Sequence, residues 1–467
     1  MPDFELLING KMVPGAGSLD VINPATEDLA GTCSRASESQ LDEAVDAAQG
    51  ALAGWAATPI AERRKALEKV AEIVVANAPE LGAILTSEQG KPLPDAIGET
   101  YGFAAFTRHF AAMDLPVEIL EDSDARRVEI HRSPLGVVAA IVPWNFPLIL
   151  LGFKLGPALI AGNTLVVKPA PTTPLATLRL AELVKDALPP GVLNVIADAN
   201  ELGSKISAHP KIRKVSFTGS TATGAKVMAG AAETLKRITL EMGGNDAGLV
   251  LGDVDPKEVA PKLFDAAFPN NGQVCIALKR LYAHEDIYDS LCEELASIAR
   301  SKKVGDGTEE GVELGPLQNK SQYEKVQAII ADAAEKGTII AGGAASDRPG
   351  YFIEPTIVRD IAEGARLVDE EQFGPALPVI KFSEPEEAIA RINRTDEGLG
   401  GSVWSSDLDR ARDLAVRFDS GTVWVNKHGE LDPGIPFSGA KQSGVGTELG
   451  RDGVMEFTQR RVINISR

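Results

Sequence analysis

The sequence has few of the residues that build disulfide scaffolds or metal centres. Its 467 residues include only three cysteines, Cys33, Cys275 and Cys292, and five histidines. No two cysteines stand at Cys-x-x-Cys spacing, and the histidines are too scattered for an evident zinc site. We therefore expect neither a disulfide framework nor a metal, and a reducing cytoplasmic location is the default for such a chain.

Positive charge is scarce as well. Lys and Arg total 47 against 66 Asp and Glu, which gives a formal net charge of −19. Such an acidic chain repels phosphate backbones and has no basic run that reverses this locally, so we expect no nucleic-acid partner. Small anionic ligands stay compatible with the sequence, because backbone N–H groups at a helix start bind phosphate whatever the net charge.

Signals for secretion or membrane insertion are missing or interrupted. Residues 1–5 lack the basic start and apolar stretch of a secretory signal. Residues 135–153 carry no charge and are long enough to cross a bilayer, but Pro143 and Pro147 break their centre. A lipid-facing helix would lose backbone hydrogen bonds there, so we predict a buried strand, an irregular loop and a buried helix instead.

A chain of this length is too long for one hydrophobic core, so two or three domains are expected. Between residues 135 and 235, short β-rich runs alternate with helical patterns, which is typical of a parallel, doubly wound α/β sheet. Thr173 is expected to cap the helix that begins at Pro174. The predicted strands are 135–143, 164–168, 192–196 and 214–217, and the predicted helices are 37–57, 60–77, 79–90, 149–161, 174–187, 202–208 and 224–235.

The alternation restarts at 246–251 and continues with helices at 287–301 and 320–336, which indicates a second α/β domain. Two further runs, 127–132 and 461–465, look like strands with no local partner. Strands that cannot pair locally suggest a sheet shared between subunits.

Two short patterns are ambiguous when each is taken alone. Cys275 follows a glycine-containing turn, and by itself it is more readily a small buried hydrophobe than a nucleophile. Residues 218–224, Thr-Gly-Ser-Thr-Ala-Thr-Gly, follow a predicted strand and suit either phosphate binding or a plain turn. They lack both the Lys-Ser/Thr of a P-loop and a GxGxxG fingerprint.

Two further patterns contain polar residues in unusual surroundings. Glu241 stands in the apolar, glycine-rich run Leu-Glu-Met-Gly-Gly-Asn, where burial would raise the pKa of its carboxyl and suit a general base. A capping or salt-bridged glutamate fits that run equally well. Asn145 lies in Pro-Trp-Asn-Phe-Pro, where its amide would be a fixed donor for a developing oxyanion or would cap a turn.

Together these patterns resemble the aldehyde dehydrogenase superfamily over nearly the whole chain. No single motif is decisive, but nine of them occur in the family order. They are PWNFP at 143–147, KLGPAL at 154–159, GNTLVVKPA at 162–170, LPPGVLNV at 188–195, FTGST at 217–221, LEMGGN at 240–245, NNGQVC at 270–275, EEQFGP at 370–375 and PFSGAKQSG at 436–444.

The resemblance implies oxidation of an aldehyde to a carboxylate through a thioester. Cys275 matches the nucleophile, and Asn145 with the backbone N–H of Cys275 would hold the oxyanion. Glu241 would be the base for the water that hydrolyses the thioester. Lys154 and Glu448 match a proton-relay pair, for which a structural ion pair is a fair alternative.

The resemblance also implies NAD or NADP as the cofactor. Lys168 matches the residue that bonds the adenine ribose, Trp144 and Ser220 would line the pyrophosphate path, and Glu371 and Phe373 would hold the nicotinamide end. The full expected cofactor set is Val142, Pro143, Trp144, Asn145, Lys168, Pro169, Ala170, Pro171, Phe217, Gly219, Ser220, Glu241, Met242, Gly243, Glu371 and Phe373.

The sequence departs from the family at several positions near this cofactor set. Pro171 stands where many NAD-specific members have a glutamate that would repel a 2′-phosphate, so we expect NAD with NADP able to compete. Residues 197–199, Ala-Asp-Ala, replace the usual glycines on the adenine side. Ser438 and Thr447 replace a frequent glycine and a frequent arginine.

The expected substrate tunnel is uncharged. Its residues, Phe146, Leu150, Phe153, Val274 and Ile276, suit an aliphatic or aromatic aldehyde, although each could also be a core residue. A carboxylate-bearing aldehyde such as succinate semialdehyde would want a cation there. Arg108 and His428 could reach in from other loops, so that alternative stays open.

The family organisation completes the expectations. We expect a Rossmann-like cofactor-binding domain from 1–116 and 134–245 and a catalytic domain from 246–435. Small β oligomerisation strands would come from 117–133 and 455–467, with 436–454 returning to the cofactor side. A homodimer or homotetramer is implied. The alternatives are a CoA-acylating or phosphorylating relative and a non-catalytic, crystallin-like scaffold, against which intact Cys275, Glu241 and Asn145 argue.

Overall fold

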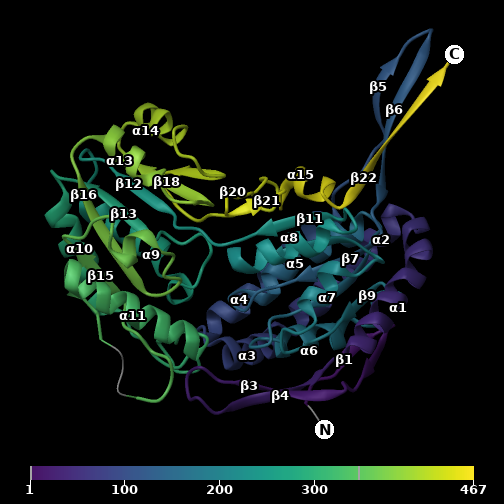
Figure 1. The fold of residues 1–467 in the computed structure, drawn as a ribbon, viewed down its shortest axis with the longest axis horizontal. Coiled ribbons are helices and arrows are strands. Elements are labelled where there is room, and N and C mark those ends of the chain that lie inside the picture. Colours follow the sequence, from purple (N-terminus) through teal and green to yellow (C-terminus); the bar gives the residue numbers. More distant parts are fainter. Residues whose placement is uncertain (1–2, 345–347) are drawn as a thin grey trace.

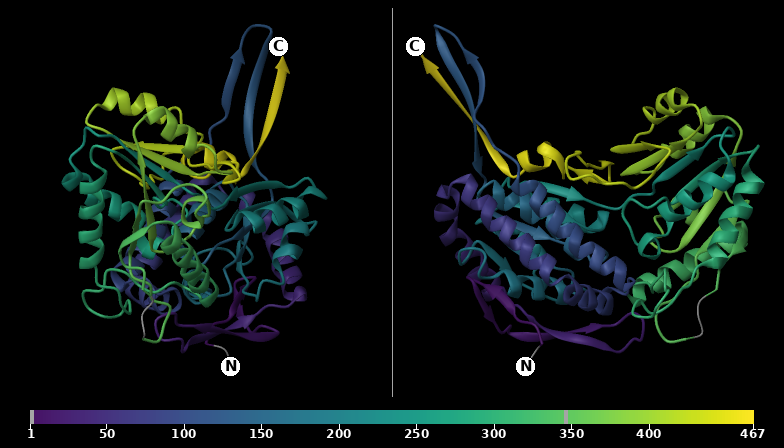
Figure 2. Two further views of the ribbon diagram at one scale, coloured as in Figure 1. Left: turned by 60° about the vertical axis from the view of Figure 1, so that its left-hand side comes forward. Right: turned by 180° about the vertical axis from the view of Figure 1, so that it is seen from behind.

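The computed structural model describes residues 3–344 and 348–467. They form two lobes, each built on a largely parallel sheet, and a three-stranded arm that projects from the first lobe (Figure 1). The view from behind shows the same two lobes with the arm standing clear of both (Figure 2). The predicted α/β class is confirmed.

The first lobe contains the doubly wound sheet that the alternating pattern predicts. Its eight strands lie in the order β2-β1-β9-β8-β7-β10-β11-β21, and the five from β9 to β11 are parallel. β7 and β8 are buried along their whole length, as expected for strands covered by helices on both faces. The strands are β1 (Leu6–Ile8), β2 (Lys11–Val13), β7 (Val137–Ile141), β8 (Thr164–Lys168), β9 (Leu193–Val195), β10 (Ile212–Thr218), β11 (Arg237–Glu241) and β21 (Gly444–Val445).

The strand order reverses between β7 and β10. Beyond the carboxyl ends of two such strands the following loops run to opposite faces and leave a crevice, where α/β proteins bind ligands. The Pro-Trp-Asn-Phe-Pro loop follows β7, and the Gly219–Ser220 turn follows β10. Topology alone therefore brings these two motifs to one crevice.

The helices of the first lobe pack against both faces of this sheet. The prediction for residues 135–153 is confirmed, because β7, an irregular loop and the almost wholly buried α5 follow one another there. Among the described residues, no single helix is long and apolar enough to cross a membrane, and α2 and α3 pass that test only as a joined pair bent by 70°. The helices are α1 (Glu38–Ala57), α2 (Ile60–Ala76), α3 (Ala78–Gln89), α4 (Leu93–Ala111), α5 (Pro147–Ile160), α6 (Leu175–Val184), α7 (Gly203–Ala208) and α8 (Thr221–Ala232).

Two predicted helix starts in this lobe were wrong. Thr173 does not cap α6; the Glu88 carboxylate accepts from Leu175 N at 2.7 Å and Ala176 N at 2.9 Å in its place. α8 begins three residues before the predicted Gly224, because the Ser220 side chain caps its first turn. Ser220 therefore lies at a helix start, not inside a turn.

The second lobe has a sheet of seven strands in the order β14-β15-β16-β13-β12-β18-β19, with β14 antiparallel at one edge. Two apolar clusters cover its two faces. Its strands are β12 (Ala247–Val250), β13 (Arg280–His284), β14 (Thr338–Ala341), β15 (Thr356–Arg359), β16 (Ala376–Phe382), β18 (Gly400–Trp404) and β19 (Thr422–Val425). Its helices are α9 (Pro256–Ala267), η1 (Pro269–Gly272), α10 (Tyr288–Ser301), α11 (Lys320–Lys336), α12 (Arg366–Asp369), α13 (Pro385–Ile392) and α14 (Leu408–Ala415).

The arm confirms both predicted strands and that 461–465 has no local partner, but it corrects the prediction for 127–132. β6 (Arg126–Pro134) pairs with β5 (Glu118–Asp122) as a hairpin and with β22 (Thr458–Ser466) on its other side. The chain end reaches this place because it runs back along the first sheet through β21 and α15 (Gly450–Met455) (Figure 1). The short pairs β3 (Gly17–Ile22) with β4 (Leu29–Arg35) and β17 (Glu397–Gly398) with β20 (Ala440–Lys441) complete the fold.

Candidate active site

A cavity of about 190 Å³ lies where the first sheet's switch point faces the second lobe. The loops after β7, β10 and β11 contribute to it from the first lobe. The segment before β13, the start of α11 and the loop before β16 contribute from the second lobe. Its lining residues are Pro143, Trp144, Asn145, Thr218, Gly219, Ser220, Met242, Gly243, Cys275, Gln322, Lys325, Glu371 and Phe373.

Asn145 and Cys275 come from different lobes and meet in this cavity. The Asn145 side chain donates from Nδ2 to the Gln273 carbonyl at 3.0 Å, two residues before Cys275. An amide nitrogen carries two hydrogens, so one fixes the side chain while the second is available to another acceptor. The pairing of these two residues in one cavity is the arrangement that oxyanion stabilisation beside a nucleophile requires.

The turn before Cys275 has an unusual backbone. Asn270, Asn271 and Gly272 all have positive φ, at 49°, 56° and 75°. Asparagine and glycine tolerate this left-handed region best, and a Cβ on Gly272 would lie 2.3 Å from the Gly374 carbonyl oxygen. Asn270 donates from Nδ2 to the Asn145 carbonyl at 3.1 Å, so the turn and the Asn145 loop hold each other.

The surroundings of Cys275 act in both directions on its thiol. Burial raises the pKa of Cys275 to about 12, the positive charge of Lys279 lowers it, and the carboxylates of Asp246 and Glu371 raise it further. The Lys279 ammonium donates to the Val274 carbonyl at 2.5 Å, directly beside the cysteine. Lys279 is therefore the buried cation next to this thiol.

Glu241 ends β11, and neither of its carboxylate oxygens has a hydrogen-bond partner among the described residues. Burial raises its pKa well above the ordinary value; the negative charge of Glu448 adds to this and the positive charge of Lys154 partly offsets it. The raised pKa expected from the sequence is confirmed. Such a carboxyl takes up a proton more readily than an exposed glutamate does.

Lys154 and Glu448 form a buried ion pair behind this site. Their Nζ and Oε1 atoms are 2.5 Å apart, and Lys154 also donates to Thr218 Oγ1 at 2.8 Å. Ser216 donates to the same Glu448 oxygen at 3.3 Å. The geometry satisfies a structural ion pair fully, and a proton-relay role stays a prediction.

The cofactor side of the cavity is a helix start with two small residues. Gly219 and Ser220 directly precede α8, a 12-residue helix whose first N–H groups could bind an anion. Gly243 allows Glu371 to approach, since a Cβ there would lie 2.3 Å from Glu371 Oε2. The rings of Trp144 and Phe373 meet edge to face at 5.3 Å across the same space.

The remaining expected cofactor residues do not line this cavity. The Lys168 ammonium, at the end of β8, lies 2.7 Å from Asp198 Oδ1, and both side chains are buried. Asp198 is the acidic residue of the 197–199 departure, so the departure places a carboxylate beside the expected ribose ligand. Those outside the lining are Val142, Lys168, Pro169, Ala170, Pro171, Phe217 and Glu241.

Three lining residues were missed from the sequence: Thr218, Gln322 and Lys325. Gln322 donates to the Phe373 carbonyl at 3.0 Å, and Lys325 donates to the Glu371 carbonyl at 2.7 Å. The helix that carries Gln322 and Lys325 was predicted with its correct bounds. No local pattern shows that its first turns face the other lobe.

The five expected tunnel residues belong to or pack against the large apolar core cluster of the first lobe, against which Cys275 also packs. Leu150, Phe153 and Ile276 belong to the first lobe's core cluster, and Phe146 and Val274 pack against it. Phe153 also meets Phe106, with ring centres 4.5 Å apart. The contacts suit an uncharged ligand, and the tunnel itself stays a prediction.

His428 does not provide a cation to that region. Its Nε2 donates to the Ile276 carbonyl at 3.1 Å, and its Nδ1 accepts from Ser402 Oγ at 2.9 Å. Burial lowers the pKa of His428 to about 3, so the ring is neutral at physiological pH. Arg108 lies exposed in the last turn of α4.

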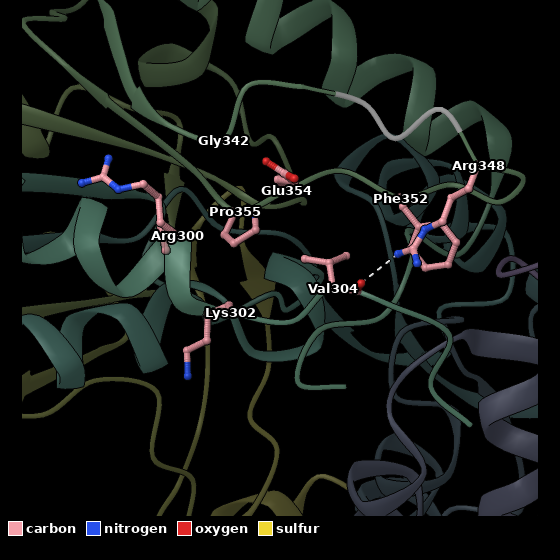
Figure 3. A pocket seen from close by; sticks show the side chains of 9 residues that line it. Arg300, Lys302, Val304, Gly342, Arg348, Phe352, Glu354 and Pro355 are labelled. Carbon is pink, nitrogen blue, oxygen red and sulfur yellow. Dashed lines mark hydrogen bonds between the residues drawn. The ribbon is translucent and has the colours of Figure 1, made fainter. Parts of the chain in front are cut away.

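A larger cavity, of about 350 Å³, lies in the second lobe beside α10. Its charged side chains do not converge: Arg300 and Lys302 point away from it, and Arg348 stacks on Phe352 with 3.8 Å between guanidinium and ring centre (Figure 3). Arg348 also donates to the Val304 carbonyl at 2.8 Å. The smaller cavity, with Cys275 and Asn145, is therefore the candidate active site.

The chain is similar to known proteins over nearly its whole length. The model of the aldehyde dehydrogenase family matches residues 12–463. The phenylacetaldehyde dehydrogenase of Pseudomonas fluorescens is 39% identical, over 99% of this chain and 96% of that protein.

Two solved structures superpose over nearly the whole chain. The NAD+ complex of aldehyde dehydrogenase from Bacillus cereus has a TM-score of 0.96 at 35% identity, covering 99% of this chain and 96% of that one. An NADP-dependent enzyme of E. coli has a TM-score of 0.97 at 35% identity, covering 99% and 98%.

Replacing His428 by glutamine should weaken the acid sensitivity of the fold. A buried neutral histidine with a pKa of about 3 stays unprotonated while its unfolded counterpart binds a proton below pH 6.5. The contribution of His428 to the free energy of unfolding is thus complete above pH 6.5 and is lost as the pH falls toward 3. At pH 5 the loss amounts to about 2 kcal/mol. Thermal unfolding from pH 8 to pH 4.5 measures this.

The plots of unfolding temperature against pH for wild type and H428Q should be parallel above pH 7 and should converge below pH 6. Asp246 Oδ2 lies 3.9 Å from His428 Nε2 and is present in both, so its titration affects both curves. An unchanged difference between wild type and H428Q across the whole range would contradict the neutral, buried histidine.

Proposed function

The chain belongs to the aldehyde dehydrogenase family, and we propose that it oxidises an uncharged aldehyde to the carboxylic acid with a nicotinamide dinucleotide. The supporting observation is that Asn145 and Cys275, contributed by different lobes, line one cavity with the start of α8. Aromatic and aliphatic side chains around Cys275 favour an uncharged substrate. A semialdehyde would want a cation near Cys275, and the hydrogen bond of His428 to the Ile276 carbonyl removes one of the two candidates for it.

The first step is attack of the Cys275 thiolate on the aldehyde carbon. The C–S bond forms as the carbonyl π electrons move to oxygen, which becomes an oxyanion. The second N–H of the Asn145 amide and the backbone N–H of Cys275 stabilise that charge. Lys279, beside the Val274 carbonyl, favours the thiolate that burial opposes.

The cavity fits a dinucleotide at three points. The α8 N-terminus with Ser220 suits a pyrophosphate, the small Gly219 and Gly243 leave room for it, and Trp144 and Phe373 offer aromatic faces. Bound there, the cofactor supplies the acceptor for the hydride that leaves the substrate carbon. The side chains of this chain orient it and keep the reacting carbon near Cys275.

The second step is hydrolysis of the thioester, with Glu241 as base. Glu241 takes a proton from water, the oxygen adds to the acyl carbon, and the C–S bond breaks to return Cys275. Its buried carboxylate, with no hydrogen-bond partner among the described residues, has the raised pKa that this role needs. Carboxylate, not an acyl-CoA, is therefore the proposed product.

Replacement of the nucleophile or the base should block different steps. With phenylacetaldehyde or propanal and NAD, Cys275→Ala should form no NADH. Cys292 is a buried cysteine of α10, and Cys292→Ala should keep wild-type turnover. Glu241→Gln should give a burst of about one NADH per chain and then steady turnover lowered about 10²- to 10⁴-fold. NADH absorbance follows all three.

Turnover by Cys275→Ala, or wild-type steady turnover by Glu241→Gln, would contradict these roles. Added CoA that yields an acyl-CoA in place of acid would favour the acylating alternative. Succinate semialdehyde belongs in the same assay, and its preference over both uncharged aldehydes would favour the semialdehyde alternative.

For the cofactor we propose NAD, with NADP able to compete. Pro171 provides no carboxylate against a 2′-phosphate, but Asp198 beside Lys168 keeps a negative charge in that region. Pro171→Glu should lower kcat/KM for NADP relative to NAD about 5- to 30-fold, which corresponds to about 1–2 kcal/mol. Pro189→Glu makes the same change at an exposed position and should leave the ratio unaltered.

Wild-type turnover with each cofactor, measured under identical conditions, gives the reference ratio. Strict selectivity for either cofactor in the wild type, or an unchanged ratio in P171E, would contradict the proposal that Pro171 allows NADP to compete with NAD.

We also propose that the arm joins subunits into a dimer or tetramer. β22 is an edge strand with a free side, and its Ile463 and Ile465, on one face, are 38% and 42% exposed. Replacing both by aspartate should reduce the mass measured by light scattering toward that of one chain. Leu235→Asp with Val416→Asp, at exposed apolar positions elsewhere, should leave the mass unchanged.

A further inference from the structure

Lys91 and Glu99 form an ion pair that is almost completely shielded from solvent. Lys91 Nζ lies 2.5 Å from Glu99 Oε2, and the two side chains are 0% and 1% exposed. Moving two charges out of water costs several kcal/mol for each ion, so such a pair needs further hydrogen bonds to be stable. Those further bonds identify what the pair holds.

Among the residues that the structure describes, the two charged groups make their further hydrogen bonds and their ring contact with the segment that contains Asn145. Lys91 Nζ donates to the Asn145 carbonyl at 2.8 Å and stands 3.6 Å from the centre of the Phe146 ring. Glu99 Oε1 accepts from Leu148 N at 2.8 Å and from Ile149 N at 3.3 Å. The cation therefore binds the end of the loop, and the anion binds the start of α5.

α5 has no capping side chain of its own. Its N-cap residue is Phe146, which makes no side-chain hydrogen bond to the first turn. Glu99 reaches across from α4 to satisfy two of the free N–H groups and places a negative charge at the positive end of the helix. Lys91 balances that charge while it holds the preceding carbonyl.

We propose that the Lys91–Glu99 pair is a positioning device for the oxyanion donor Asn145. The proposal rests on the proposed function, in which the Asn145 amide meets the developing charge. The Asn145 side chain is fixed by Gln273, and its backbone carbonyl is fixed by Lys91 and Asn270. Lys91 and Glu99 touch no reacting atom, so they act through Asn145.

A double-mutant cycle separates positioning from simple stabilisation. In the wild-type background, Glu99→Gln should lower kcat/KM for the aldehyde about 10- to 100-fold, because small displacements of a catalytic donor are costly. Asn145→Ala should lower it about 10²- to 10³-fold. In the Asn145→Ala background, Glu99→Gln should cost less than about twofold, since the group it positions is gone.

The matched control is Glu88→Gln. Glu88 is also a buried glutamate that caps a helix from another element, at Leu175 and Ala176 of α6, far in sequence from Asn145. It should lower Tm as Glu99→Gln does and leave kcat/KM within about twofold of wild type. If the Glu99→Gln variant fails to fold, Lys91→Gln takes its place. It should show the same losses of kcat/KM in the wild-type and Asn145→Ala backgrounds.

The outcomes separate two kinds of failure. A wild type that forms no NADH from any aldehyde would overturn the proposed function. A wild type and Asn145→Ala that behave as expected, with the full loss from Glu99→Gln persisting in the Asn145→Ala background, would overturn the positioning proposal alone. An equal loss of kcat/KM in Glu88→Gln would overturn it as well.

Discussion

One hydrogen bond, from Asn145 Nδ2 to the Gln273 carbonyl, joins the loop after β7 to the loop that carries Cys275. The first belongs to the lobe with the doubly wound sheet, and the second precedes a strand of the other sheet. The distance between the proposed oxyanion donor, Asn145, and the proposed nucleophile, Cys275, therefore depends on how the two lobes sit together. The left-handed turn at Asn270–Gly272 and the Lys91–Glu99 pair make this junction rigid from its two sides.

Three buried ion pairs hold charge inside the first lobe. Lys91 with Glu99, Lys154 with Glu448, and Lys168 with Asp198 each bring opposite charges together where water is excluded. Glu241 differs, because neither of its oxygens has a hydrogen-bond partner among the described residues. A buried carboxyl without a partner lowers the stability of the fold, but its raised pKa suits it to proton transfer. Active sites often combine these two properties.

Sequence reasoning succeeded where the information is local. Short apolar runs between helical patterns predicted four of the five parallel strands of the first sheet, and β11 was missed. The Pro-Trp-Asn-Phe-Pro loop and Cys275 were selected by the ordered set of motifs, because Cys275 alone is more readily a buried hydrophobe. It failed where a partner is distant in the sequence. Glu88 caps α6 from 87 residues away, and β6 pairs with β22 from the other end of the chain. Gln322 and Lys325 were missed for the same reason, since helical periodicity does not say which lobe a helix start faces.

The return of the chain end along the first sheet has a consequence for biosynthesis. Ser443 accepts from Met242 N at 2.9 Å through its carbonyl, and Glu448 completes the ion pair with Lys154. A ribosome adds these residues 168 and 173 positions after Cys275. Because domains fold as they emerge, a nascent chain that has passed Phe373 contains every residue that lines the cavity, but not yet the carboxylate that pairs with Lys154. The charges that act on Glu241 are therefore complete only after residue 448 has been added.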